Sequence, residues 1–387
     1  MSAPFCRKDL SAEGLLRTAR RVFAAIPDVP DNDIALVDHL MSGLALFGLK
    51  YPSLLQFEQD CREVTTRANL KALYGIKQAP SDTRFRERLD GLDPRCLHPL
   101  YKALLASLQR GKGLEGFDYL DGHYLLSLDG TGYFSSKKVH CAQCAEKHHR
   151  DGTTTYYHQM LGAVLVHPEH KEVFPLVPEP ILKPDGAKKN DCERNAAKRL
   201  LTDVRRAHPH LKLIVVEDAL ASNAPHIRHL QALDFKFILG AKQSDHKYLF
   251  EWVDTSEKTA ETTRVDAHGY RHHFRYLNGA PLNDANFDLE INFLEVWEHA
   301  PDGTVTHFAW VTDIPINDDN LMTLMRGARA RWKIENETFN TLKNQGYHFE
   351  HNFGHGHQYL STVLMHLMML AFLIDQIQHR CCRLFHA

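Results

Sequence analysis

The stretch HYLLSLDGTGYFSS, residues 123–136, opens the part of the chain in which strand patterns begin. Its apolar run LLSL ends at Asp129 and is followed by a Gly-rich segment, which predicts a strand that ends in an aspartate and a turn. Two further strands are predicted from YYHQMLGAVLV (156–166) and EVFPLVPEPIL (172–182). Three successive strands therefore begin a sheet.

Beyond residue 190, helix and strand patterns alternate. Helical spacing is found in NDCERNAAKRLLTDVRRAH (190–208) and APHIRHLQAL (224–233), whereas LKLIVVEDALAS (211–222) and FKFILGAK (235–242) are typical of strands. Three strands followed by alternating helix and strand are characteristic of a sheet covered by helices. The sequence therefore predicts an α/β fold.

The alternation stops between about residues 245 and 312. FRYLNG, FDLEINFLEVWEH and THFAWVTDI alternate in polarity like strands, which predicts a β-rich insertion. The longest apolar run, Leu360–Ile374, contains polar residues and is shorter than a membrane span. We therefore expect a buried C-terminal helix at about 359–380 and no membrane association.

Residues 1–115 have helical patterns, and within them 67–92 predicts two helices around a turn. The second of these helices carries Arg84, Arg86 and Arg88. One interpretation is a helix-turn-helix that presents arginines to DNA. The other is a helical bundle with a solvated basic face. Residues 116–387 form the remaining domain.

The composition favours no particular partner. The chain has 387 residues, 43% of them hydrophobic, and a formal net charge of −2, so any site for a polyanion depends on local clusters of cations. Scattered cysteines and a start without a signal-peptide pattern predict a reducing cytoplasm. Cations that could contact phosphate surround Lys188 and Lys189, and also Arg331 and Lys343. A solvated face explains such runs equally well.

Three acids stand at the ends or on the packed faces of predicted elements. Asp129 and Asp218 each follow an apolar strand, where active groups of α/β sheets collect. In RARWKIENETFNTLK (329–343), a spacing of about 100° per residue places Glu335 within the apolar stripe formed by Trp332, Phe339 and Leu342. Glu337 falls on the opposite face, where it can pair with a lysine four residues back.

Each acid also has a simpler explanation. Asp129 could form a turn, Asp218 could cap a helix, and Glu335 could pair with Arg331. Taken together, the three carboxylates predict a site for two Mg²⁺ (or Mn²⁺) ions, which suit oxygen ligands. Such ions activate a water or a 3′-hydroxyl and stabilise the leaving oxygen of a phosphodiester.

A second ligand set lies in HCAQCAEKHH (140–149). Cys141 and Cys144 have Cys-x2-Cys spacing, His148 or His149 could be a third ligand, and Cys192 could complete a tetrahedral structural zinc site. The alternative is a hairpin tip with unliganded thiols. A later Gly-rich loop, HNFGHGHQ (351–358), is expected to bring its histidines near phosphate.

Several segments resemble the DDE transposases of bacterial insertion sequences, in particular the group marked by Tyr-x2-Arg-x3-Glu-x6-Lys. Ala328 stands at the tyrosine position, and Lys343 comes eight residues after Glu335 rather than seven. The similar segments are SLDGTGYF (127–134), VVEDALAS (215–222), RWKIENETFNTLK (331–343), NQGYHFEHNFGHG (344–356) and PSDTRFRERLD (80–90).

The resemblance implies a ribonuclease H-like catalytic core over 116–387, with the β insertion between the second and third acids. It also implies Mg²⁺-dependent cutting and joining of double-stranded DNA, namely terminal inverted repeats and a target. A homodimer on DNA, in the nucleoid of a bacterial cytoplasm, is expected. Asp129, Asp218 and Glu335 take the catalytic roles. Two alternatives are a ribonuclease H-like nuclease or resolvase that cuts without joining, and a zinc-stabilised DNA-binding protein without catalysis.

Overall fold

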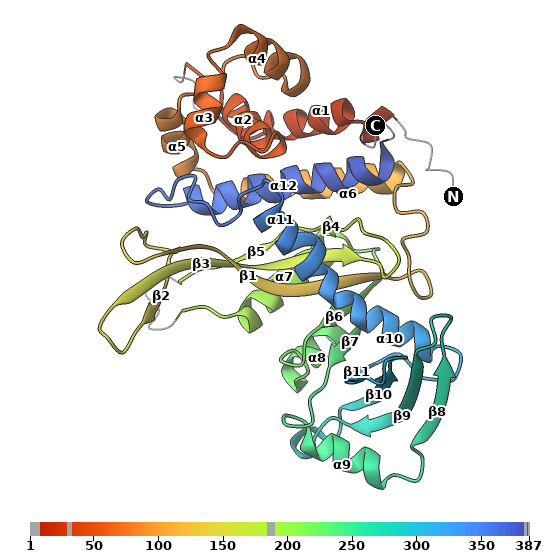
Figure 1. The fold of residues 1–387 in the computed structure, drawn as a ribbon. Coiled ribbons are helices and arrows are strands. Elements are labelled where there is room, and N and C mark those ends of the chain that lie inside the picture. Colours follow the sequence, from red (N-terminus) through yellow and green to blue (C-terminus); the bar gives the residue numbers. More distant parts are fainter. Residues whose placement is uncertain (1–7, 29–32, 184–189, 383–384, 386–387) are drawn as a thin grey trace.

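The computed structural model of the chain describes residues 8–28, 33–183, 190–382 and 385. Figure 1 shows a layer of N-terminal helices above a sheet, and a lower β-rich part formed by the insertion. The C-terminal helix α12 (Leu360–Cys381) lies between the helical layer and the sheet. The α/β class is confirmed.

The N-terminal layer consists of helices and short helical turns. Gly75, in the left-handed conformation with φ +68°, ends one helix, and Ser81 caps the next by accepting a hydrogen bond from the backbone N–H of Arg84. These residues make the predicted turn. The elements are η1 (Lys8–Leu10), α1 (Ala12–Phe23), α2 (Leu36–Gly48), α3 (Leu54–Asp60), α4 (Val64–Asn69), η2 (Leu70–Tyr74), α5 (Asp82–Asp90), η3 (Pro94–Leu97) and α6 (His98–Arg110).

The sheet has the strand order β2-β3-β1-β6-β7-β11-β10-β9-β8, with β4 and β5 paired to β3. Strand β1 is antiparallel to β3 and parallel to β6, which is in turn parallel to β7. The strands are β1 (Tyr124–Ser136), β2 (Ala145–His148), β3 (Thr154–Val166), β4 (Phe174–Pro175), β5 (Glu179–Ile181), β6 (Leu213–Glu217), β7 (Lys236–Gly240), β8 (Ala260–Val265), β9 (Arg271–Pro281), β10 (Glu290–His299) and β11 (Val305–Thr312).

Strand β1 does not end at Asp129, so the predicted Gly-rich turn is wrong. The strand continues to Ser136, with Gly130 opposite Leu161 and a register shift after Gly132. A Cβ at Gly130 would lie 2.2 Å from Oε1 of Glu193. The glycine therefore allows a carboxylate to approach the strand closely, which is a common reason for glycine inside a strand.

The single strand predicted over 172–182 is divided into the short strands β4 and β5, both paired to β3. Pro175, Pro178 and Pro180 lie within this segment, and a proline has no N–H to donate to a ladder. Continuous pairing is therefore lost.

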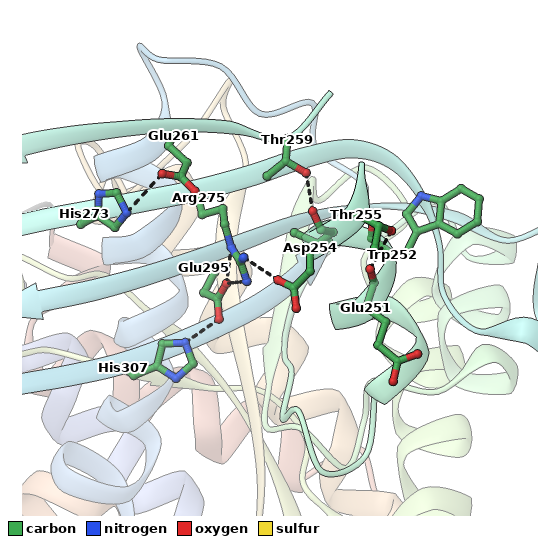
Figure 2. Close-up of polar contacts among 11 residues, drawn as sticks. Glu251, Trp252, Asp254, Thr255, Thr259, Glu261, His273, Arg275, Glu295 and His307 are labelled. Atoms are coloured by element: carbon green, nitrogen blue, oxygen red, sulfur yellow. Dashed lines mark hydrogen bonds and ion pairs between the residues drawn. The ribbon is translucent and has the colours of Figure 1, made fainter. Parts of the chain in front are cut away.

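The insertion extends the main sheet instead of forming a separate one, because β11 pairs antiparallel with β7. It also contains a helix, α9 (Lys247–Thr255), that the sequence patterns did not predict. Figure 2 shows how this helix is attached: Arg275 on β9 lies between Asp254 of α9 and Glu295 of β10, at 2.6 and 2.5 Å. Glu295 also contacts Nε2 of His307 at 2.7 Å.

The remaining helices connect and cover the sheet. They are α7 (Glu193–Ala207), α8 (Ala224–Ala232), η4 (Asp284–Asn286), α10 (Leu321–Arg329), η5 (Ala330–Trp332), η6 (Ile334–Phe339), α11 (Asn340–Asn344) and α12. By length and composition α12 could cross a membrane, but 89% of its apolar window is buried inside the fold. It is therefore a core helix, as the sequence predicted.

Candidate active site

Asp129 and Asp218 have equivalent positions relative to the pairing of the parallel strands β1 and β6. The last paired residues are Ser127 of β1 and Val216 of β6; Asp129 lies two residues after Ser127, and Asp218 lies two residues after Val216, just past the end of β6. Residues two apart on a strand share a face, and paired strands lie about 4.8 Å apart. Both aspartates consequently line one cleft, with a volume of about 620 Å³.

The Glu335 segment is not a regular α-helix, contrary to the prediction. After α10 the chain forms a 3-10 turn, Ala330–Trp332, then a π-helix, Ile334–Phe339, and then α11. A π turn holds more residues than an α turn, so a period of about 100° per residue fails here. Trp332, expected on the apolar stripe, is exposed, and Glu335 is about half-exposed, with 45% of its side chain accessible.

The π-helix offers a structural counterpart to the spacing between Glu335 and Lys343. An i→i+5 turn accommodates one residue more than an i→i+4 turn. The Tyr-x2-Arg-x3-Glu-x6-Lys pattern places its glutamate and lysine seven positions apart, and in this chain they are eight apart. Between Glu335 and Lys343 the chain runs first as the π-helix, up to Phe339, and then as α11.

Arg331 joins Glu335 to Asp129. Its Nη1 lies 3.0 Å from Oε1 of Glu335 and 3.1 Å from Oδ2 of Asp129. The ion pair that the simpler alternative required is therefore present, but the same guanidinium also reaches the acid on β1. Asp129 of the sheet and Glu335 of the π-helix thus meet around one cation.

The Asp129 carboxyl binds its proton more tightly than an ordinary aspartate does. Burial, together with a hydrogen bond to Glu335, raises the pKa of Asp129 to about 7, against the lowering effect of Arg331. The protonated form of the Asp129 carboxyl is therefore favoured to a higher pH than in an ordinary aspartate. Negative charge is crowded at this point of the cleft, which is a property of cation-binding and catalytic carboxylates.

Glu337 is placed differently from Glu335. Lys333, its expected partner four residues back, donates instead to the carbonyl oxygen of His170 at 2.7 Å. Within the described ranges, no ion pair joins Glu337 to Lys333. Glu335, by contrast, is connected to Asp129 of the sheet through Arg331.

A fourth carboxylate, Glu193 at the start of α7, was not predicted from the sequence. It lines the same cleft, and its carboxylate lies against Gly130. Partial burial and the negative charge of Asp218 raise the pKa of Glu193. Acids are common in the first turn of any helix, so the sequence around Glu193 contains no signal that distinguishes it.

A buried pair supports the loop after β6. Nε2 of His226 lies 2.6 Å from Oε2 of Glu217, and both side chains are less than a tenth exposed. Burial alone would lower the pKa of His226, but the Glu217 carboxylate outweighs burial and raises it. Because Glu217 precedes Asp218, this pair fixes the strand end that carries the second acid.

Most of the cations that we expected to contact DNA form ion pairs with acids of the protein itself. Lys343 pairs with Glu350 at 2.9 Å, and Arg331 pairs with two acids as described. Lys188 and Lys189 lie outside the described residues. On α5, Arg84 pairs with Asp33, Arg86 with Asp82 and Arg88 with Asp28.

Two cations on the wall of the cleft are available to a ligand. Arg194 and Lys198 on α7 are exposed and line the cleft that contains Asp129 and Asp218. Exposed cations beside carboxylates allow phosphate to be held near a hard metal ion. The cleft therefore contains both carboxylates and exposed cations.

The oxygen ligands of the cleft fit Mg²⁺ or Mn²⁺ in kind. Asp129, Asp218 and Glu193, which line the cleft, and Glu335, which Arg331 joins to Asp129, supply hard carboxylate oxygens, the type that these ions prefer. Among the described residues, no three carboxylates hold oxygens within 4.8 Å of one another. The donor atoms therefore match these ions in kind, while the carboxylates are more widely spaced than the ligands of one compact site.

A separate group of potential metal ligands, two cysteines and two histidines, is much more compact. Cys141 and Cys144, in the loop between β1 and β2, meet His158 of β3 and His355 of the loop before α12, with all four ligand atoms within 4.8 Å. The hydrogen bond from Cys144 holds the pKa of Cys141 far below its ordinary value, against the raising effect of burial. This cluster could bind a metal ion.

The structure places the other two predicted zinc ligands elsewhere. His148 pairs with Thr154 at the far end of the β2–β3 hairpin, whereas Ala145 lies opposite Tyr157. The histidine nearest the cysteines is consequently His158. Cys192 is exposed at the start of α7 and lines the carboxylate cleft. Their assignment as ligands is therefore corrected to His158 and His355.

No known family profile matches the chain, and no curated protein matches it. Among solved structures, it is similar to a piggyBac transposase synaptic complex with hairpin DNA, with a TM-score of 0.41 and 10% identity, covering 97% of this chain and 73% of that one. It is also similar to the NurA nuclease from Sulfolobus solfataricus, with a TM-score of 0.25 and 9% identity, covering 53% and 72%. Similarities this weak do not establish the function of the chain.

Proposed function

We propose that the protein is a DNA transposase that cuts and joins transposon ends by two-metal-ion phosphodiester chemistry. The observation that carries the proposal is the register of the parallel strands β1 and β6, which places Asp129 and Asp218 each two residues after the last pair, with Glu335 brought to Asp129 through Arg331. An acid within β1, an acid directly after β6 and a third acid from a later helix correspond to the ligand set that the resemblance implies.

The order of the sheet supports a ribonuclease H-like core. Strands β1, β3 and the short β4 and β5 pair antiparallel, and β6 and β7 then continue the sheet in parallel from β1. The β insertion follows β7 and precedes the Glu335 segment, so it stands between the second and third acids.

Mg²⁺ or Mn²⁺, held by Asp129, Asp218 and Glu335, would supply activation of a water or 3′-hydroxyl and stabilisation of the leaving oxygen. Arg331 orients the carboxylates of Asp129 and Glu335 toward one another. The Asp129 carboxyl has to release its proton to solvent before it serves as a ligand, because a hard cation needs the charged form.

The exposed cations Arg194 and Lys198 would hold the phosphate backbone along the cleft wall. Terminal inverted repeats and target DNA, a homodimer on DNA, and a place in the nucleoid of a bacterial cytoplasm are parts of the same proposal.

The test begins with the DNA on either side of the gene, where inverted repeats supply candidate ends. The protein is incubated with linear DNA carrying these ends, a target plasmid, and Mg²⁺ or Mn²⁺. A transposase gives metal-dependent cuts at the ends and joined products. Cuts without joining would identify a nuclease or resolvase, and DNA binding without any cut would identify a non-catalytic DNA-binding protein.

An Asp218→Asn variant separates the proposed site from contaminating nuclease. It keeps the shape of the side chain and removes the charge, so it should abolish both products while leaving DNA binding intact. Activity equal to that of the unmodified chain would exclude Asp218 from the site.

A further inference from the structure

The distances within the Cys/His cluster match a tetrahedral metal site. For zinc with sulfur ligands near 2.3 Å and nitrogen ligands near 2.0–2.1 Å, the tetrahedron has edges of about 3.8 Å between sulfurs and about 3.5 Å between sulfur and nitrogen. Sγ of Cys141 and Sγ of Cys144 are 3.9 Å apart, and Nε2 of His158 lies 3.4 Å from each. Nε2 of His355 lies 3.3 Å from Sγ of Cys144.

The cluster is closed. Cys144, His158 and His355 are buried, and aromatic rings line it: Tyr133 stacks on His158, and Phe134 lies 4.1 Å from His355 between ring centroids. Four protein ligands behind aromatic walls leave no position for a substrate. A closed set of two sulfurs and two nitrogens is characteristic of structural zinc.

The local sequence brings His355 into this position. His355 stands between Gly354, with φ +149°, and Gly356, with φ +66°. A Cβ at Gly356 would lie 2.3 Å from Oδ1 of Asp90, and one at Gly354 would lie 3.0 Å from Leu360. The two glycines therefore allow a sharp path that turns the histidine inward.

The cluster joins segments that are far apart in the chain. Cys144 and His355 are separated by 211 positions. The loop that carries His355, residues 345–359, has neither helix nor strand and connects α11 to α12. Irregular loops of this length are uncommon in compact domains unless they have a function or an anchor.

The same loop is held from its other side by the N-terminal layer. The Asp90 carboxylate, at the end of α5, accepts hydrogen bonds from the backbone N–H groups of His357, Gln358, Tyr359 and Leu360. Burial alone would raise the pKa of Asp90, but these hydrogen bonds hold it below its ordinary value. Asp90 thereby caps α12, and the Cys/His cluster fixes the chain just before that cap.

We propose that Cys141, Cys144, His158 and His355 bind one structural zinc ion, which clamps the loop between α11 and α12 to strand β3 and the β1–β2 loop. The cysteines bind as thiolates and release their protons to solvent. The clamp sets the position of the segment that carries Glu335, because that segment leads directly into the loop. The assignment stands on the geometry of the cluster and does not rest on the transposase proposal.

The experiment measures metal in the full-length protein purified without chelator. We expect about one zinc per chain. Alkylation of Cys141 and Cys144, followed by mass spectrometry, should be slow until a strong chelator is added and fast afterwards. A zinc-free chain in which both thiols react at the same rate with and without chelator would overturn the proposal.

Variants test the ligand set. Cys144→Ser and His355→Ala should lose zinc, whereas the matched controls Cys192→Ser and His148→Ala should retain it. His355→Cys should keep the metal, because a thiolate replaces the imidazole; a histidine needed only for packing on Phe134 would not be rescued in this way. Loss of zinc from Cys192→Ser, or its retention in His355→Ala, would contradict the assignment.

Limited proteolysis of the unmodified chain tests the clamp without relying on any variant. Chelation should create new cleavage sites within residues 345–359, and added zinc should remove them. An identical cleavage pattern in both states would show that the ion does not hold the loop.

Discussion

The carboxylate cleft and the Cys/His cluster are both candidate metal sites on one sheet, yet they differ in donor atoms and in access. The cleft offers partly exposed oxygens beside exposed cations, and its Asp129 is joined to the half-exposed Glu335 through Arg331. The cluster offers sulfur and nitrogen behind aromatic rings. Exposed oxygen ligands leave room for a substrate beside the metal ion. Enclosed sulfur and nitrogen ligands leave no such room, so a metal ion there can only stabilise the fold.

The two sets are connected through one stretch of chain. Glu335 lies in the π-helix, and His355 lies in the loop that follows α11. A change in either set thus acts on the same stretch, but with different consequences. Loss of a carboxylate should remove chemistry and preserve the fold, while loss of a thiol or imidazole should weaken the fold.

The largest expected effect is that of Asp129→Asn. Metal-stabilised charge is worth several kcal/mol in the transition state, so cleavage should fall by roughly a thousandfold. Melting temperature in chelator should not fall, because the variant relieves crowded negative charge. Cys144→Ser should instead lower the melting temperature. The contrast between the two sets fails if Asp129→Asn unfolds the protein while Cys144→Ser leaves its stability unchanged.

The second prediction concerns pH. The folded-state pKa of Asp129, about 7, is above its ordinary value of 3.8. The folded protein therefore binds more protons than the unfolded chain between these values. The stability that Asp129 contributes through its bound proton is complete at a pH below its ordinary pKa, and it is lost as pH rises toward 7. Metal binding depends on pH in the opposite direction and strengthens as pH rises, since the ion needs the ionised carboxylate.

Two titrations measure this pH dependence. Mn²⁺ affinity should increase up to about pH 7 and then level off. In chelator, the Asp129→Asn variant should gain stability relative to the unmodified chain as pH rises over the same range. A flat Mn²⁺ affinity from about pH 5 to 8 would show that Asp129 does not titrate with the ion.

The third prediction concerns the loop that carries His355. Gly356→Ala should lower the free energy of unfolding by about 1–2 kcal/mol, because alanine is strained at positive φ and its Cβ would displace the Asp90 carboxylate. Gly116→Ala is the control, since Gly116 has φ +68° and no atom within 4 Å of an added Cβ. Equal losses in the two variants, measured by denaturant unfolding, would mean that the cap by Asp90 contributes nothing.

The smallest effect is expected from the arginines of α5. Arg84 and Arg86 already pair with acids, so their joint change to Ala should weaken DNA binding only slightly. Changing Arg194 and Lys198 should weaken it more and reduce the salt slope by about 1 for each phosphate that the protein no longer neutralises. A larger effect from Arg84 and Arg86 would locate the main DNA surface on the helical layer.

Local patterns were sufficient to predict some parts of the site. The apolar run before Asp218 predicts β6 and places the acid directly after it, as observed. Strand β1 was also predicted, but its end was not, because the effect of Gly130 depends on Glu193 from another element. The parallel register that aligns Asp129 with Asp218 is likewise a tertiary property.

Other features depend on interactions that no local pattern contains. His355 joins Cys144 across 211 positions, so spacing near the cysteines favoured His148 instead. The π-helix at Glu335 breaks the period that was used to assign its face, and the expected burial of Trp332 fails for that reason. Helix α9 lies in a polar, Thr-rich context and is held by Arg275 from a neighbouring strand.

The most direct test compares Glu335→Gln with Glu337→Gln in single-turnover cleavage, with the melting temperature of both variants measured in parallel. The amide keeps the shape of Glu335 and removes the charge that a hard cation needs. We expect Glu335→Gln to bind DNA and to melt near the temperature of the unmodified chain, but to lose metal-dependent cleavage, while Glu337→Gln cleaves normally. A stable Glu335→Gln that cleaves at the unmodified rate, or a loss of cleavage in Glu337→Gln alone, would contradict the proposed site.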